Sequence, residues 1–200
     1  MNKLSLVVKR VMDITIVLVA MVLLLPFWLL IIVSVYIAFG SPVIYKSVRV
    51  GKNRKPFQSY KFRTMTNERD AAGELLPDKD RLRPVGRFIR RTSLDELPQL
   101  INVLEGHMSV IGPRALPEGH YQVMPEKYSK RADVKPGLTG WNQVNYQGQE
   151  RSWDQKYSLD LEYLERQSIL FDVKILFLTV GVLFRRFFSN KTGESLNSKE

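Results

Sequence analysis

The sequence predicts an α+β protein that is attached to a membrane through one apolar segment near its N-terminus. Three observations lead to this expectation. No charged residue occurs between Ile14 and Tyr45, and the remainder alternates β-prone runs with helix-like segments at a length suited to one domain. The 200 residues also include 30 Lys and Arg against 20 Asp and Glu, a formal charge of +10. Such an excess predicts an anionic partner, which could be nucleic acid, an acidic membrane surface or a phosphorylated substrate.

The composition excludes several classes of site. The chain has no cysteine, which removes disulfide scaffolds, Cys-ligated zinc, iron–sulfur clusters and thiol nucleophiles. Phosphate-binding P-loops, dinucleotide-binding glycine motifs, G-x-S-x-G elbows and H-E-x-x-H zinc motifs are also missing from the sequence. The two histidines, His107 and His120, lack the spacing of metal ligands.

The apolar segment is long enough to cross a bilayer. A straight helix over residues 14–39 would reach about 39 Å at about 1.5 Å per residue. The segment is too long for the apolar region of a cleaved signal peptide, and no small-residue cleavage pattern follows it. Basic residues flank the segment on both sides: Lys3, Lys9 and Arg10 before it, and Lys46, Arg49, Lys52, Arg54 and Lys55 after it. The positive-inside rule therefore draws both ends toward the cytoplasm.

Pro26 lies near the middle of this segment. A proline removes a backbone hydrogen bond and can bend a helix sharply. Each arm would then reach roughly 18–20 Å, short of the hydrocarbon core of about 30 Å. Two topologies follow: a spanning helix with a mild kink, which hydropathy alone favours, or a helix that enters, breaks at Pro26 and returns to the same face.

Two β-prone runs follow the apolar segment, Pro42–Val50 and Phe57–Thr64, and the Gly- and Pro-containing residues 51–56 join them. This pattern predicts a β-hairpin. Residues 43–63 hold seven basic side chains and no acidic one, so the hairpin is expected to be strongly cationic.

The central part predicts short elements. Residues 67–81 are polar and turn-rich and read as a loop, whereas residues 93–106 read as a short helix closed by a glycine. Residues 112–116 and 135–144 are expected to be loops rich in Pro and Gly. Residues 118–131 are expected to be partly helical, with a break at Pro125.

The last long element covers about residues 154–188. Its longest uncharged stretch, Ile175–Phe184, has ten residues and is too short to span a bilayer. Both a helix lying at the membrane interface and a core helix of the globular part fit this pattern.

The pair Asp95 and Glu96 is the candidate site for chemistry. One interpretation is structural, because Ser93 and Glu96 have the spacing of a helix capping box. However, five arginines occupy residues 81–91 and the cationic hairpin comes shortly before. A carboxylate among cations is expected to stay ionised with a lowered pKa, and it can bind Mg²⁺ or attack phosphorus while arginines hold phosphate oxygens. Together with the membrane segment, this predicts phosphoryl transfer to a lipid at a membrane surface.

Six strings in order along the chain carry a resemblance to a known family: KRxxD at 9–13, YKFRTM at 60–65, GELLP at 73–77, RTSLDELPQ at 91–99, MSVIGPR at 108–114 and KPGLTGW at 135–141. The chain closely resembles the small monotopic phosphoglycosyl transferases of bacteria, the membrane sugar transferases that begin glycan assembly on polyprenyl phosphate. The series runs over nearly the whole chain and is therefore highly specific.

The resemblance implies a monotopic membrane protein of α+β class. Its N-terminal helix is expected to be re-entrant and broken near Pro26, with short amphipathic helices at the interface around a small β-hairpin. The implied division is a membrane helix over 1–40, a catalytic domain over 41–188 and a polar tail over 189–200. The implied location is the cytoplasmic face of the bacterial inner membrane.

The resemblance also implies a reaction. Asp95 would attack the β-phosphorus of a UDP-sugar, release UMP and hold the phosphosugar covalently. Polyprenyl (undecaprenyl) phosphate would then attack that adduct in a ping-pong cycle. Glu96 is similar to the partner acid that supports the metal site, and Mg²⁺, held by Asp95 and Glu96, is the implied cofactor.

The family pattern further marks substrate-binding positions. Arg90 and Arg114 match positions that contact phosphate, and Lys61, Arg63 and Thr64 match a basic strand beside the site. Asn145 falls in the motif that follows Trp141. The implied partners are a UDP-sugar, polyprenyl phosphate and inner-membrane phospholipid, with self-association left open.

The chain departs from the family pattern at two places. Ala115 stands where the family usually has proline, and Tyr146 and Gln147 stand where it tends to have glycine; Arg151 is a candidate for the cation that usually follows. Because these regions are expected to touch the nucleotide sugar, the sequence does not identify the sugar. Two non-enzymatic alternatives remain: a membrane adaptor whose basic face binds anionic lipid, and a nucleic-acid binder, which the absence of a recognised binding module disfavours.

Overall fold

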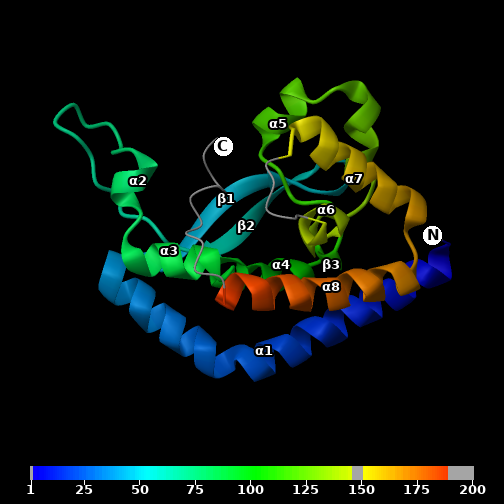
Figure 1. The fold of residues 1–200 in the computed structure, drawn as a ribbon, viewed down its shortest axis with the longest axis horizontal. Helices are drawn as coiled ribbons and strands as arrows, with labels where there is room; N and C mark the ends of the chain where they lie inside the picture. Colours follow the sequence, from blue (N-terminus) through cyan, green and yellow to red (C-terminus); the bar gives the residue numbers. More distant parts are fainter. Residues whose placement is uncertain (1, 146–150, 189–200) are drawn as a thin grey trace.

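A computed structural model describes residues 2–145 and 151–188 of the chain. Helix α1, Lys3–Phe39, lies beneath a body of short helices and two small sheets (Figure 1). The helix begins where the Asn2 side chain accepts a hydrogen bond from the Ser5 N–H, and it ends at Gly40, whose φ of 70° favours glycine. Pro26 lies inside α1, which is drawn as a shallow V with both arms rising toward the body (Figure 1).

Helix α1 contacts the body mainly through its two arms, and Trp28, near the bend, packs against both apolar clusters. Its buried residues are Lys9, Asp13 and Val17 in the first arm and Ile31 and Val35 in the second. These positions recur at four-residue spacing, which places them on one helix face. Within the described part of the chain, α1 is the one helix long and apolar enough to cross a membrane.

The predicted hairpin is confirmed. Strands β1, Ile44–Val50, and β2, Pro56–Phe62, pair antiparallel with Tyr45 opposite Lys61. The connection contains the 3₁₀ turn η1, Lys52–Arg54. The buried Asn102 closes the free edge of β2, because its Nδ2 donates to the Gln58 carbonyl at 2.8 Å and its Oδ1 accepts from the Tyr60 N–H at 3.0 Å.

A second, parallel sheet was not expected. Strands β3, Ser109–Ile111, and β4, Gly137–Thr139, pair with Ser109 opposite Gly137. The backbones approach so closely that a Cβ on Gly137 would lie 2.1 Å from the Gly112 nitrogen. The expectation of plain loops at 112–116 and 135–144 is therefore wrong in part, because β4 and helix α6, Trp141–Val144, occupy most of the second segment.

The central segment consists of short turns of helix. Residues 67–81 are largely irregular, as expected, and end in α2, Asp78–Arg81; α3, Pro84–Arg91, follows. The expected single helix over 93–106 is wrong, because the chain forms the 3₁₀ turn η2, Leu94–Glu96, and then α4, Gln99–Leu104. The left-handed φ of 60° at Ser93 separates η2 from α3, and Pro98, which lacks a backbone N–H, lies between η2 and α4.

The C-terminal half adds four elements. Helix α5, Glu118–Val123, and the turn η3, Glu126–Asp133, flank Pro125 as predicted. The expected single element over 154–188 is two helices, α7, Trp153–Arg166, and α8, Ile169–Phe188. The chain turns between them at Gln167 and Ser168, where the Ser168 hydroxyl accepts from the Phe171 N–H. The polar tail, 189–200, lies outside the described residues.

Two apolar clusters join α1 to the body. The larger contains Val17 of α1, Val103 of α4, Ile111 of β3 and Ile175 of α8. The smaller joins Ile31 and Val35 to Phe62 of β2 and Ile89 of α3. Each arm of α1 thus packs on a different part of one body.

The KRxxD motif makes the polar contacts of the first arm. The Arg10 guanidinium donates to the carbonyls of Val103 and Leu104 at the end of α4, a favourable place for a cation. Asp13 Oδ1 accepts from the Ser109 hydroxyl and the Val110 N–H of β3. Lys9 reaches Asp172 of α8 at 2.6 Å. The motif therefore fixes α1 on three separate elements.

Candidate active site

The turn η2 presents Asp95 and Glu96 at the end of β2. The Ser93 carbonyl accepts from the Glu96 N–H, while the Ser93 hydroxyl accepts from Arg186 Nη1 of α8 at 2.8 Å. The Ser93 side chain makes no capping hydrogen bond. The capping-box interpretation is therefore wrong, and it had been the basis for assigning the two acids a purely structural role.

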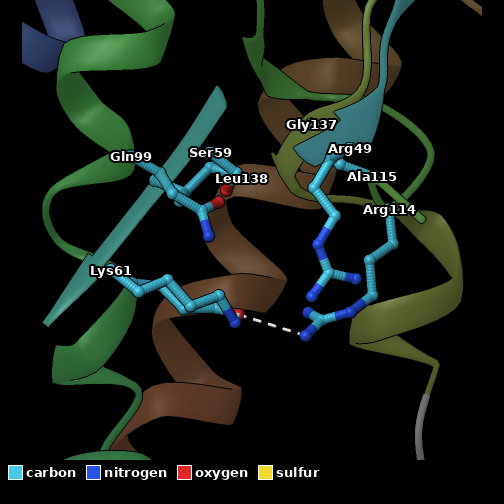
Figure 2. A pocket seen from close by; sticks show the side chains of 9 residues that line it. Arg49, Ser59, Lys61, Gln99, Arg114, Ala115, Gly137 and Leu138 are labelled. Carbon is cyan, nitrogen blue, oxygen red and sulfur yellow. Dashed lines mark hydrogen bonds and ion pairs between the residues drawn. The ribbon is translucent and has the colours of Figure 1, made fainter. Parts of the chain in front are cut away.

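Basic side chains from two different elements hold the acidic pair. Lys61 Nζ of β2 lies 2.9 Å from Glu96 Oε1 and 3.9 Å from Asp95 Oδ2. Arg114, which follows β3, places Nη2 3.1 Å from the same Glu96 oxygen. Figure 2 shows Lys61 and Arg114 reaching this point from opposite sides. Lys61 and Arg114, which are more than 50 positions apart in the sequence, thus meet at the acidic pair. The four residues Lys61, Asp95, Glu96 and Arg114 come together as expected from the sequence.

The environment separates the two carboxyl groups in acidity. Burial on its own would raise the pKa of Glu96, but the charges of Arg114 and Lys61, with hydrogen bonds from both, lower it to about 2. Burial raises the pKa of Asp95 to about 6, and the negative charge of Glu96 adds to this increase. The cations Lys61, Arg90 and Arg114 act in the opposite direction without overcoming burial. The expected lowering of the pKa therefore holds for Glu96 and is wrong for Asp95.

Arg90 is the third cation that acts on Asp95. It extends from the last turn of α3, where its Nε donates to Thr64 Oγ1 at 2.8 Å and its Nη2 lies 3.1 Å from Met65 Sδ. Its charge contributes to the pKa of Asp95. Gly86 of α3 shows how close Thr64 lies to α1. A Cβ on Gly86 would lie 1.9 Å from the Thr64 carbonyl and 3.1 Å from the ring of Phe39, the last residue of α1. Arg90 and Thr64 therefore belong to the end of the site nearest α1.

Two of the expected site residues make their hydrogen bonds elsewhere. The Arg63 guanidinium donates to the carbonyls of Met65 and Ser41, at the junction between α1 and the hairpin. Asn145 lies at the end of α6, where its amide donates to the Trp141 carbonyl at 2.8 Å. The contacts of these two residues do not join them to Asp95. Tyr146 and Gln147, two departures from the family pattern, fall outside the described residues.

A small pocket opens beside Glu96. Its lining includes the expected residues Lys61, Glu96 and Arg114, the departure Ala115, and the unanticipated residues Arg49, Ser59, Gln99, Gly137 and Leu138 (Figure 2). Strand alternation from Lys61 could have identified Ser59, whereas Arg49 needs the β1–β2 register as well. Ser59 and Lys61 are two residues apart in β2 and share a face, and Arg49 falls on the same face of β1.

The site can supply only part of a metal coordination sphere. Within residues 2–145 and 151–188, no group of three or more His, Cys, Asp or Glu side chains could hold a metal ion. Mg²⁺, however, is commonly bound through one or two carboxylates together with substrate phosphates and water. The adjacent carboxylates of Asp95 and Glu96 fit this mode of binding.

Comparison with known proteins gives a consistent result. The model of the bacterial sugar transferase family matches residues 4–186. The sugar transferase EpsL of Bacillus subtilis (strain 168) is 51% identical over 149 residues, 74% of this chain and 73% of that protein. The exopolysaccharide production protein PSS of Rhizobium leguminosarum bv. phaseoli is 37% identical over 191 residues, 88% of this chain and 94% of that protein.

A longer relative is named for the reaction that it catalyses. The UDP-glucose:undecaprenyl-phosphate glucose-1-phosphate transferase of Escherichia coli (strain K12) is 41% identical over 181 residues. The match covers 86% of this chain but only 39% of that relative. This chain therefore corresponds to well under half of the E. coli protein.

Proposed function

This chain belongs to the bacterial sugar transferase family, and from this we propose that it transfers a sugar 1-phosphate from a UDP-sugar to undecaprenyl phosphate at a membrane surface. The reaction named for the E. coli relative supports a UDP-sugar and undecaprenyl phosphate as the substrate classes. The observation that carries the proposal is the buried Asp95–Glu96 pair, held among Lys61, Arg90 and Arg114.

In the first half-reaction, an Asp95 carboxylate oxygen attacks the β-phosphorus of the donor. A bond forms between this oxygen and phosphorus, and the bond from phosphorus to the bridging oxygen breaks. The electron pair stays on that oxygen, and UMP leaves. With a pKa of about 6, Asp95 is largely ionised at neutral pH yet more basic than an ordinary aspartate, which favours nucleophilic attack.

In the second half-reaction, a phosphate oxygen of undecaprenyl phosphate attacks the same phosphorus. The bond to Asp95 breaks, and the carboxylate is restored. The net change converts UDP-sugar and polyprenyl phosphate to polyprenyl-diphosphate sugar and UMP. Lys61 and Arg114 stabilise negative charge on the phosphate oxygens during both steps, because they approach the acidic pair from two sides.

Glu96 has a separate role. Its pKa of about 2 keeps it ionised throughout the cycle, and its contacts to Lys61 and Arg114 hold these cations in place. Asp95 and Glu96 are the residues that would hold Mg²⁺. When bound, this ion supplies neutralisation of diphosphate charge.

The shape of α1 supports a re-entrant topology. Both arms pack on the same body, whereas apolar residues around Pro26 are exposed, among them Val22 and Leu23 at 74% and 68%. A polar body cannot enter the hydrocarbon core, so both ends of α1 are expected on one face, with the bend inserted. The basic flanks support a cytoplasmic location for that face. Exposed apolar residues of α8, including Leu170 and Phe177, support its placement at the interface.

The reaction is tested by UMP release from purified protein in nanodiscs, with Mg²⁺, undecaprenyl phosphate and a panel of UDP-sugars. We expect UMP release with at least one donor and a loss of about 10⁴-fold or more in Asp95→Asn, as for removal of a nucleophile. Circular dichroism should show the same fold for both proteins. UMP release at equal rates from both proteins would contradict the role of Asp95.

The topology is tested with single cysteines at positions 3 and 48, since the chain has no cysteine of its own. Both positions should react with a membrane-impermeant reagent from the cytoplasmic side alone. Labelling from opposite sides would mean that α1 spans the bilayer.

A further inference from the structure

The hairpin has a second basic side chain that faces the site, Arg49, in addition to Lys61. In the β1–β2 register, Tyr45 pairs with Lys61, Ser47 with Ser59 and Arg49 with Phe57. Because side chains alternate along a strand, Arg49 shares a face with Lys61 and Ser59. All three residues of this set line the pocket beside Glu96.

The Arg49 and Arg114 side chains converge. Figure 2 shows both side chains extending toward the tip of Lys61, and both line the pocket beside Glu96. Arg49 Nε donates to the Ser47 hydroxyl at 3.3 Å, which fixes the direction of the side chain from its own strand. Each guanidinium presents a fork of N–H donors that matches the oxygens of a phosphate group, so two arginines lining one pocket suit a phosphate ligand.

Arg49 and Arg90 lie toward opposite ends of the hairpin. Arg49 belongs to the far end of the hairpin, next to Val50, whose N–H donates to the Leu116 carbonyl. Arg90 is bound to Thr64 at the end beside α1.

We propose that Arg49, together with Arg114, binds the nucleotide phosphate of the donor and holds the leaving UMP. This inference rests on the proposed function and adds a substrate-binding residue to it. The sugar phosphate then lies between this pocket and Asp95, so that the bond to the bridging oxygen points toward Arg49 and Arg114. Charge that develops on that oxygen as the bond breaks is neutralised there.

The primary test is UMP binding, measured by equilibrium dialysis with nanodisc-embedded protein. Arg49→Gln should weaken UMP binding by about 10- to 100-fold, the effect of losing a charge-assisted hydrogen-bond pair. Arg49→Lys should lie between this variant and the wild type, because it keeps the charge and loses the fork. Lys46→Gln is the matched control: it removes a positive charge from the same strand, but Lys46 is exposed and lies over the Tyr60 ring on the other face.

The second readout separates the half-reactions. Arg49→Gln should raise the KM for the UDP-sugar and slow formation of the covalent adduct by a similar factor. Transfer from a preformed adduct to undecaprenyl phosphate should keep its wild-type rate. A purely structural role would slow both half-reactions alike, and thermal melting checks that the variants are folded.

The outcomes decide the inference. UMP affinity within twofold of wild type in Arg49→Gln would overturn it, and so would equal losses in Arg49→Gln and Lys46→Gln. Wild-type protein that binds UMP but releases none from any donor would count against the proposed function instead. In that case, the binding comparison still tests Arg49.

Discussion

Two clusters in this molecule contain a lysine–carboxylate ion pair but have different roles. Lys9 of α1 and Asp172 of α8 lie 2.6 Å apart, with side chains 9% and 0% exposed. Lys61 and Glu96 lie 2.9 Å apart, with side chains 21% and 19% exposed. The first cluster is enclosed by protein, whereas the second faces a pocket.

The two clusters differ in how far their hydrogen-bonding groups are paired within the protein. Lys9 also donates to the Ile111 carbonyl at 3.0 Å, and the Tyr163 hydroxyl donates to the other oxygen of Asp172 at 2.8 Å. Burial raises the pKa of Tyr163 above its usual range, so its hydroxyl remains a donor. The cluster at Glu96 instead brings arginines and a lysine to a surface that a ligand can reach. Burial and hydrogen bonds within the protein thus characterise a structural contact, whereas exposure to a pocket characterises a binding site.

The largest effects on stability and on UMP release are expected when the lysine of each cluster is replaced by methionine. Lys9→Met leaves Asp172 buried without its cation and should destabilise the protein by about 3–5 kcal/mol. Activity per folded molecule should be preserved. Thermal unfolding in nanodiscs and UMP release together measure the two quantities.

The matched variant is Lys61→Met. Glu96 keeps its contact to Arg114, so the loss of stability should be small, while UMP release should fall by about 100-fold or more. Equal stability losses in the two variants would remove the distinction between the clusters.

An intermediate effect is expected from pH. The folded-state pKa of Asp95 is about 6 against an ordinary value of 3.8, so the folded protein binds this proton more tightly than the unfolded chain. The stabilisation is fully present below about pH 4 and is lost as the pH rises to about 6, with an upper limit of about 3 kcal/mol. Unfolding of metal-free protein, measured with chelator between pH 4 and 7, should show this loss in wild type and not in Asp95→Asn. Parallel pH profiles for the two proteins would contradict the raised pKa.

The smallest effect is expected from Tyr163→Phe. Asp172 loses one hydrogen bond but keeps Lys9, so the variant should lose about 1–1.5 kcal/mol. Its UMP release should match that of wild type. A larger drop in UMP release than in stability would connect this enclosed cluster with the reaction.

Local patterns predicted the local parts of the fold. The hairpin followed from β-prone runs around a Gly–Pro connection, and the break at Pro125 from proline geometry. The β3–β4 pair could not be predicted in this way, because three-residue strands carry little periodicity and their pairing joins distant segments. The turn at Gln167 and Ser168 was missed because it contains neither Gly nor Pro.

The site was predicted in composition and less well in arrangement. Charge density pointed to Asp95 and Glu96 among cations, which the structure brings together with Lys61 and Arg114. Arg49 was missed, because its place in the site depends on strand register. The pKa of Asp95 was misjudged, since sequence shows neighbouring charges but not the burial that outweighs them.

The amide of Asn102 has a consequence for how copies of this protein meet. Two-stranded sheets present free edges, and such edges invite pairing with a strand of another molecule. Asn102 occupies the Gln58 carbonyl and the Tyr60 N–H at the edge of β2, as a neighbouring strand would. A strand of another molecule would have to displace this side chain before it could pair with β2 at these two positions.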